Sequence, residues 1–165
     1  MSFTLDYSVD VPSPLDLTFK VLTGKEYTHH VLDLYGMLAW YKPGQPGERN
    51  GHPIFNFQFA ERVPVLFGLT STDVVLTAEQ EVRPEEKMLV YRSRSSMVKV
   101  VKTRSFHATD NPQTTRVKEH LLVTCPKLLK CVVEPAARDA HRFHMSNYHK
   151  LFKEGALPVP VHLAD

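Results

Sequence analysis

The sequence has few cysteines and little net charge, and both features exclude kinds of protein. Its 165 residues include two cysteines and carry a formal net charge of +2. Cys125 and Cys131 have neither the spacing of metal ligands nor a C-x-x-C redox motif, so we expect free thiols in a reducing compartment. Lysine and arginine are scattered along the chain, which argues against a nucleic-acid interface.

Long apolar runs are missing as well. No run approaches the ~20 residues of a membrane-spanning helix. The N-terminus has no basic segment followed by an apolar one, as a secretory signal would. We therefore expect a cytoplasmic protein without a transmembrane segment. The length fits a single domain over residues 1–165, as a monomer or a homodimer.

Familiar catalytic motifs are absent too. The chain has no Ser–His–Asp pattern, no Gly-rich phosphate loop and no H-E-x-x-H motif, which argues against hydrolase, kinase and zinc-peptidase chemistry. Nine histidines are an unusual number, and His141, His144 and His149 lie close together in the sequence. Their spacing on a helix does not let them converge on one ion. The sequence therefore predicts neither a metal nor a cofactor.

The first third of the chain predicts one strand, two short helices and a loop. Phe3–Val11 alternates apolar and polar residues, as a half-buried strand does. The spacing of Leu15, Phe19 and Leu22 predicts a short helix, and a second is expected over about 25–34. Residues 41–53 contain three prolines and three glycines, so we expect a long loop there.

From Ile54 to Cys125 the apolar residues recur with a period of two. Turns such as Asp110-Asn111-Pro112 separate the runs and no helix intervenes, so this region predicts an antiparallel meander. The stretch from Pro126 to Gly155 then predicts one long helix. Pro135 lies inside it and should either kink the helix or break it.

One face of this last helix mixes apolar and small residues with two polar ones, His144 and Asn147. A helix face that only packs in a core is usually apolar throughout. The mixed composition therefore indicates a helix that encloses a cavity against the sheet. The apolar and small residues on this face are Leu129, Val133, Ala136, Ala137, Ala140, Phe143 and Leu151.

The order of the elements, with Val9-x-Val11-Pro12-x-Pro14 leading into Phe19-x-x-Leu22, resembles the START-like (SRPBCC) superfamily. That superfamily includes the Bet v 1 pollen allergens, the polyketide cyclases/dehydrases and aromatases, and the lipid-transfer START domains. The resemblance covers nearly the whole chain. It implies an α+β helix-grip fold, in which a curved antiparallel sheet of about seven strands wraps around a long C-terminal helix. It also implies two short helices after strand 1 and a hydrophobic cavity between sheet and helix.

Three residues are candidates for acid–base chemistry in such a cavity. Glu119 shares its strand face with Val117 and Leu121, so an apolar face toward the cavity would carry Glu119 with it. Burial would raise its pKa, which suits a general acid or base; the alternatives are a bulge that turns it outward or a local ion pair. Tyr91 and His144 could also move protons. The alternatives for them are a hydroxyl at the rim and a hydrogen-bonded structural histidine.

Strand parity and helical face also predict the residues that would line a ligand. A mostly apolar pocket with a few placed polar groups is the general pattern of small-molecule sites. The predicted set is Phe55, Phe57, Phe59, Leu76, Gln80, Tyr91, Leu121, Ala140, Phe143 and Asn147.

The sequence leaves two principal functions open. The first is binding of a hydrophobic or aromatic small molecule, such as a lipid, a polyketide or a similar metabolite, in the internal cavity. The second, which the polyketide-cyclase members of the superfamily suggest, is a cyclase, dehydratase or isomerase that acts on a polyketide-like or aromatic substrate by general acid–base catalysis. A third is an adaptor domain whose cavity is closed.

Overall fold

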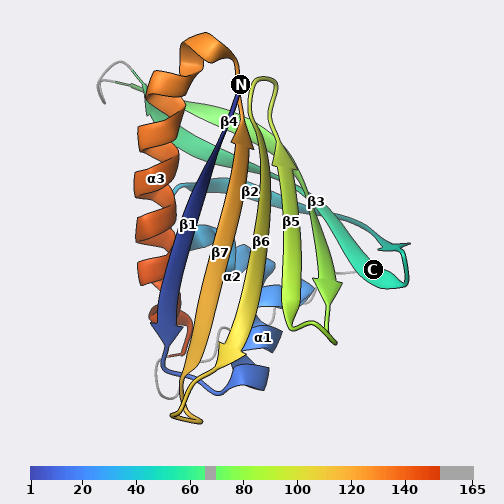
Figure 1. Cartoon of the computed structure of the whole chain (residues 1–165). Helices are drawn as coiled ribbons and strands as arrows, with labels where there is room; N and C mark the ends of the chain where they lie inside the picture. Colours follow the sequence, from blue (N-terminus) through green and yellow to red (C-terminus); the bar gives the residue numbers. More distant parts are fainter. Residues whose placement is uncertain (66–69, 153–165) are drawn as a thin grey trace.

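The computed structural model describes residues 1–65 and 70–152, which form one curved antiparallel sheet with helices on its concave side (Figure 1). In chain order the elements are β1 (Ser2–Val11), α1 (Leu15–Thr23), the 3-10 helix η1 (Lys25–Tyr27), α2 (Thr28–Asp33), β2 (Leu38–Arg49), β3 (His52–Val65), β4 (Thr70–Arg83), β5 (Met88–Arg94), β6 (Lys99–Ala108), β7 (Thr115–Thr124), the 3-10 helix η3 (Lys127–Leu129), α3 (Lys130–Ser146) and the 3-10 helix η4 (Tyr148–Phe152).

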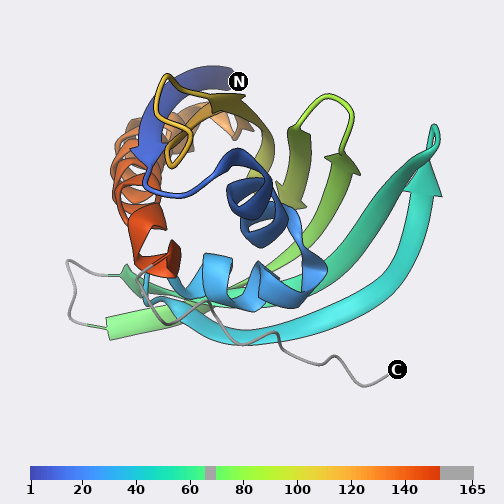
Figure 2. The same cartoon turned by 90° about the horizontal axis from the view of Figure 1, so that it is seen from below.

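The sheet has seven strands in the order β1-β7-β6-β5-β4-β3-β2, and every neighbouring pair is antiparallel. The crossover after β1, which contains α1 and α2, places the first strand beside the last one. Seen from below, the sheet curves around α1, α2 and α3 (Figure 2). This arrangement confirms the helix-grip fold, the meander and the two short helices after strand 1.

Strand alternation fixes which side chains face the helices. In β7 every second residue is buried, from Thr115 through Val117, Glu119 and Leu121 to Val123. A one-residue slip would exchange the two faces, so the apolar members of this set hold the register. Glu119 is therefore carried to the inner face by its neighbours.

Residues 41–53 form a strand and a turn, so the predicted loop is wrong. β2 pairs with β3 as a hairpin that ends at Arg49↔His52, with Asn50 and Gly51 at φ of 53° and 80°. An Asn-Gly pair favours this two-residue turn because both residues tolerate a positive φ. Prolines are tolerated here because β2 is an edge strand, and a register shift separates Pro43 from Pro46.

The C-terminal helical region lies where the sequence predicts it, in three pieces. The helix α3 runs from Lys130 to Ser146 between the 3-10 turns η3 and η4; the predicted end at Gly155 falls outside the described residues. The helix continues through Pro135 without a break. Pro135 and Cys131 are both exposed, so water can reach the Cys131 carbonyl that a proline leaves without its helical hydrogen bond.

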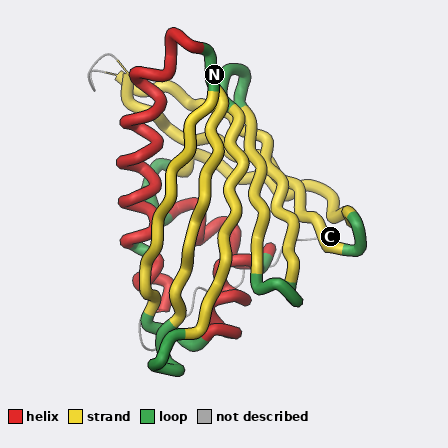
Figure 3. Tube along the Cα trace, viewed as in Figure 1, coloured by secondary structure: helices red, strands yellow, loops and turns green. Residues whose placement is uncertain are grey.

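The helix α3 runs along the β1 edge of the sheet (Figure 3), where the Tyr7 hydroxyl donates a 3.0 Å hydrogen bond to the Arg138 carbonyl. Its inner side differs from the predicted face. Ala136 and Phe143 are exposed, whereas His141 and Tyr148, which are not among the predicted face residues, point inward against Glu119. No helix among the described residues is long and apolar enough to cross a membrane.

Three apolar clusters lie on the concave side. The first packs α1, α2 and η4 on the sheet, the second packs α3 on β1 and β7, and the third is an aromatic group on β3, β4 and β5. Their central buried residues are Val21, Leu22, Phe106, Val117, Met145 and Leu151; Phe3, Leu5, Leu121, Val123 and Cys125; and Phe55, Phe57, Phe59, Ala78 and Tyr91.

Candidate functional site

A group of charged and polar side chains lies on the inner face of the sheet; we call it the charged cluster. It is centred on Glu119, whose side chain is fully buried. The members come from β6, β7, α3 and η4, far apart in the sequence. They are Lys102, Arg104, Glu119, His141, His144 and Tyr148.

One oxygen of Glu119 is fully engaged. Oε1 accepts a 2.5 Å hydrogen bond from Arg104 Nε and a 2.6 Å hydrogen bond from the Tyr148 hydroxyl. Arg104 also donates to the Tyr148 hydroxyl oxygen, and its Nη1 donates to the Leu22 carbonyl at 3.0 Å. Arg104 thus ties β6 to β7, to the end of α1 and to η4, which is a structural role.

The other oxygen of Glu119 is buried without a partner. Oε2 lies 3.7 Å from His141 Nδ1, and neither atom has a hydrogen bond in the described residues. A buried polar atom left unpaired costs roughly 1–3 kcal/mol. Such atoms are rare in folded proteins and call for an explanation, such as a missing water, ion or ligand.

The inward position of Glu119 agrees with its predicted parity, but its predicted protonation is wrong. Burial alone would raise its pKa, yet Arg104, Lys102 and His141 together hold the pKa well below the ordinary value. The reason is the ion pair, which the sequence left open as the alternative. Glu119 is therefore ionised at neutral pH and has no proton to donate there.

Lys102 is the cluster's least satisfied cation. Its Nζ lies 3.8 Å from Glu119 Oε1 and 4.9 Å from the centre of the Tyr91 ring, and nothing in the described residues accepts a hydrogen bond from it. Burial lowers the pKa of Lys102 to about 8, although Glu119 acts in the opposite direction. At that pKa about one tenth of the amine is neutral at pH 7 and about half at pH 8.

His144 is held in one neutral form. Its Nε2 lies 2.7 Å from the Val31 carbonyl, which can only accept, so Nε2 carries the proton. Burial lowers the pKa of His144 to about 3. Its Nδ1, 3.3 Å from the Tyr148 hydroxyl, therefore presents a lone pair; the shorter bond of that hydroxyl goes to Glu119. His144 anchors α3 to α2, as the structural alternative proposed.

The predicted aromatic residues form one wall beside the cluster; we call it the aromatic wall. Phe55, Phe57 and Phe59 are buried and stacked along β3 with centroids 5.5 and 5.9 Å apart. Tyr91 is buried 6.1 Å from the Phe57 ring, and burial raises its pKa. The predicted residues Leu76 and Leu121 also pack inward, in the aromatic and the α3 clusters respectively.

The other predicted ligand residues have different surroundings. Gln80 is buried, but its Oε1 accepts a 3.3 Å hydrogen bond from Thr28. Asn147 is buried and donates from Nδ2 to the Phe143 carbonyl at 2.8 Å, within the helix end. Phe143 itself is 48% exposed and packs edge-on against Tyr35. Ala140 is half-buried.

Comparisons with known proteins agree on the fold. No family model matches the chain, and no curated protein sequence matches it. A solved Thermus thermophilus protein, TTHA0849, superposes with a TM-score of 0.71 at 12% identity, covering 93% of this chain and 100% of that one. The Zhui aromatase/cyclase from Streptomyces sp. R1128 gives 0.65 at 13%, covering 94% and 99%. Truncated norcoclaurine synthase from Thalictrum flavum gives 0.65 at 14%, covering 94% and 96%.

The chain has the Bet v 1-like helix-grip fold. Within this fold, the sequence had not pointed to Lys102 and Arg104 on β6. They share the inward face with Phe106, and Arg104 lies directly opposite Glu119 in the register. Complementary charges on the inward parity of neighbouring strands were the signal that could have revealed them.

Two further groups of the site were missed. The Tyr41 hydroxyl and His29 Nδ1 are both buried without a hydrogen-bond partner in the described residues, and their rings lie 6.0 Å apart beside Phe57. Tyr41 lies in the segment that the sequence predicted to be a loop, so strand alternation was not used to predict which way its side chain points.

Glu61, on β3, was also missed. Burial raises the pKa of this carboxyl, against the opposing effect of Lys102.

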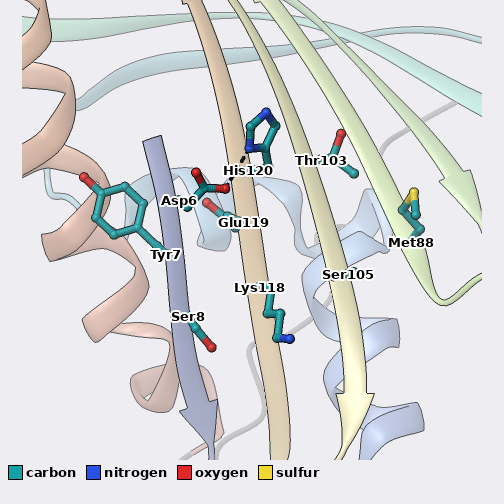
Figure 4. Close-up of a pocket in the computed structure, with 9 residues that line it drawn as sticks. All are labelled: Asp6, Tyr7, Ser8, Met88, Thr103, Ser105, Lys118, Glu119 and His120. Carbon is teal, nitrogen blue, oxygen red and sulfur yellow. Dashed lines mark hydrogen bonds and ion pairs between the residues drawn. The ribbon is translucent and has the colours of Figure 1, made fainter. Parts of the chain in front are cut away.

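The outer face of the same Bet v 1-like sheet has an open hollow of about 500 Å³ (Figure 4). Its polar centre is Asp6 and His120, with Oδ1 and Nδ1 2.7 Å apart and both side chains more than half exposed. Exposed pairs of this kind contribute little energy. The residues that line the hollow are Asp6, Tyr7, Ser8, Met88, Thr103, Ser105, Lys118, Glu119 and His120.

Proposed function

We propose that this protein binds an aromatic or otherwise apolar small molecule between the inner face of the sheet and α3, with a polar group of the ligand at the charged cluster. The observation that carries this proposal is the pair Glu119 Oε2 and His141 Nδ1, which are buried, 3.7 Å apart and without a hydrogen bond in the described part of the chain. A ligand hydroxyl or amine can donate to Glu119 Oε2, and a ligand hydroxyl or carbonyl can interact with His141.

The aromatic wall supports the apolar half of this proposal. Four stacked or tilted rings of the wall contact one another at centroid distances of 5.5–6.1 Å. Aromatic faces accept a flat ligand by offset or edge-on packing, at a gain of about 0.5–1.5 kcal/mol per pair beyond area burial. The unpartnered Tyr41 hydroxyl at this wall offers a second polar contact.

A second candidate function is acid–base catalysis on the bound molecule. Lys102, whose pKa is lowered to about 8, and Glu61, whose pKa is raised, are oppositely perturbed groups that interact electrostatically. Such pairs mark acid and base assignments in enzymes. The Zhui aromatase/cyclase and norcoclaurine synthase carry enzymatic names on the same fold. A cyclase, dehydratase or isomerase would use Lys102 as base in place of the Glu119 base expected from sequence.

Thermal melting in the presence of aromatic, polyketide-like and lipid compounds tests the binding proposal. A ligand of the folded state raises the melting temperature with concentration. We expect His141→Ala to weaken the shift, while His120→Ala on the outer face leaves it unchanged. Melting temperatures that no compound raises would contradict the binding proposal.

Catalysis is tested on any compound that binds. Lys102→Arg keeps a positive charge but removes a base of accessible pKa, so turnover should fall at least tenfold while affinity changes little. An unchanged turnover rate in Lys102→Arg would exclude Lys102 as the base.

A further inference from the structure

We infer that the Lys102 amine is a covalent capture site, which forms an imine with an aldehyde or ketone group of an aromatic ligand. The inference rests on the proposed binding site and names the class of molecule that it takes. It rests on three observations: the position of Nζ beside the Tyr91 ring, the charged groups around it, and the lack of a hydrogen-bond acceptor among the described residues.

The amine lies where the aromatic wall meets the charged cluster. Lys102 is on the inner face of β6, directly opposite Tyr91 in the register with β5, and Nζ lies 4.9 Å from the Tyr91 ring centre. Its side chain is 9% exposed. A ligand carbonyl group that reaches the edge of the Tyr91 ring therefore lies close to Nζ.

The amine also has no hydrogen-bond acceptor among the described residues, and its contacts are a long ion pair with Glu119 and the face of the Tyr91 ring. Arg104 Nε and the Tyr148 hydroxyl already occupy Glu119 Oε1, which leaves Lys102 at 3.8 Å from that oxygen, beyond hydrogen-bond range. A buried ammonium without an acceptor is unfavourable. The charged and titratable groups that influence it are Glu61, Glu119, Arg104, His141 and His144, together with the Tyr91 ring.

A neutral amine in an apolar site is a nucleophile toward carbonyl carbon. The Nζ lone pair attacks the carbonyl carbon, and a proton moves from nitrogen to oxygen to give a carbinolamine. The hydroxyl then leaves as water with a proton delivered through His141, and the nitrogen returns a proton as the C=N bond forms. The balance is amine plus carbonyl to imine plus water, without an oxidant or reductant.

Reductive trapping tests this inference on the full chain. The protein is incubated at pH 7 with a small excess of benzaldehyde, cinnamaldehyde or octanal and sodium cyanoborohydride, followed by intact mass and peptide mapping. We expect one dominant adduct, on Lys102, that forms at least tenfold faster than adducts on other lysines. The labelling rate should rise with pH to a plateau above about 8.

Two variants and one non-reactive ligand make the result decisive. Lys102→Arg should lose the dominant adduct, whereas Lys99→Arg, at an exposed position of the same strand, should keep it. Adducts spread over surface lysines, or equal labelling of Lys102→Arg, would overturn the imine. If the aldehydes and the matching alcohols raise the melting temperature and no Lys102 adduct forms, the imine is refuted and the binding proposal survives.

Discussion

Glu119 Oε1 receives two hydrogen bonds of 2.5 and 2.6 Å, while Oε2, in the same buried carboxylate, receives none from the described residues. Taking a carboxylate out of water costs several kcal/mol unless its partners compensate. Arg104 provides that compensation on one side only. The other side faces His141 at 3.7 Å without a hydrogen bond among the described residues, and this asymmetry is why we place the ligand's polar group there.

Tyr148 and Tyr41 have buried hydroxyls that differ in their hydrogen bonding. Tyr148→Phe removes the donor to Glu119 and leaves an Arg104 Nη2 donor unpaired, so the free energy of unfolding should fall by about 1–3 kcal/mol. Tyr41→Phe removes a buried hydroxyl that has no partner, so stability should change by less than about 0.5 kcal/mol or rise. Urea unfolding of both variants measures the difference.

The Tyr41→Phe and Tyr148→Phe variants also test whether the Tyr41 hydroxyl contacts a ligand. If the Tyr41 hydroxyl contacts a ligand, Tyr41→Phe should lower ligand affinity while stability is kept. A loss of stability in Tyr41→Phe as large as that in Tyr148→Phe would show that the Tyr41 hydroxyl has a structural partner, and would remove it from the site.

Acid should destabilise the fold below about pH 6.5. Burial lowers the pKa of His144 to about 3 in the folded state, and the pKa of His141 is also lowered. The unfolded chain then binds these protons first, so stability present above pH 6.5 is lost as the pH falls. His144 alone contributes a slope of about 1.4 kcal/mol per pH unit. Glu119, with its lowered pKa, adds to the loss below about pH 4.5.

Urea unfolding at a series of pH values measures this slope. His144→Gln removes one titrating group, so its unfolding free energy should fall less steeply between pH 6 and 4 than that of the wild type. Equal slopes would mean that His144 is already protonated in the folded state.

At the scale of elements, the β2–β3 hairpin depends on particular glycines. A Cβ at Gly44 would lie 2.8 Å from the Asn56 carbonyl oxygen, whereas a Cβ at Gly47 would meet only Ile54 at 3.9 Å. Gly44→Ala should therefore cost about 1–3 kcal/mol, and Gly47→Ala should be neutral or slightly stabilising. Equal stabilities of the two variants by urea unfolding would contradict the observed pairing of β2 with β3.

The hairpin also shows where sequence reasoning stopped. The density of proline and glycine between residues 41 and 53 indicated a loop, because these residues usually interrupt strands. Asn50-Gly51 nonetheless carried a two-residue turn signal. Whether a proline-rich segment can form a strand depends on its position at the edge of the sheet. A single sequence does not show which strand will lie at the edge.

Alternation gave the inner face of β7 correctly because three apolar residues, Val117, Leu121 and Val123, shared the parity of Glu119. The inward face of α3 was harder to predict, since Ala136, Ala137 and Ala140 mark no strongly apolar side and a shift of one residue moves the face by ~100°. The ionisation of the buried side chains was harder still to predict. The low pKa of Glu119 depends on Arg104 and Lys102, which only the pairing of β6 with β7 brings to it.

At the scale of the whole molecule, the charged cluster lies on the concave face among three apolar clusters. The helices α1 and α2 close one end of the sheet, α3 closes the β1 edge, and the aromatic wall occupies the β3 side (Figure 2). The first apolar cluster joins α1, α2 and η4 to the sheet, the second joins α3 to β1 and β7, and the third joins β3, β4 and β5. Among the described residues, the buried polar atoms of this face that have no hydrogen bond include Glu119 Oε2, His141 Nδ1, the Tyr41 hydroxyl and His29 Nδ1.

Native mass spectrometry of the protein purified from its own cells tests the central claim, that a small molecule occupies this place. Two helix variants make the measurement specific: His141→Trp fills the inner side of α3, and Arg142→Trp places the same ring on the exposed side. We predict that the wild type and Arg142→Trp release one small molecule on gentle activation, whereas His141→Trp carries none. A molecule retained equally by His141→Trp, or none on any of the three proteins, would contradict the account.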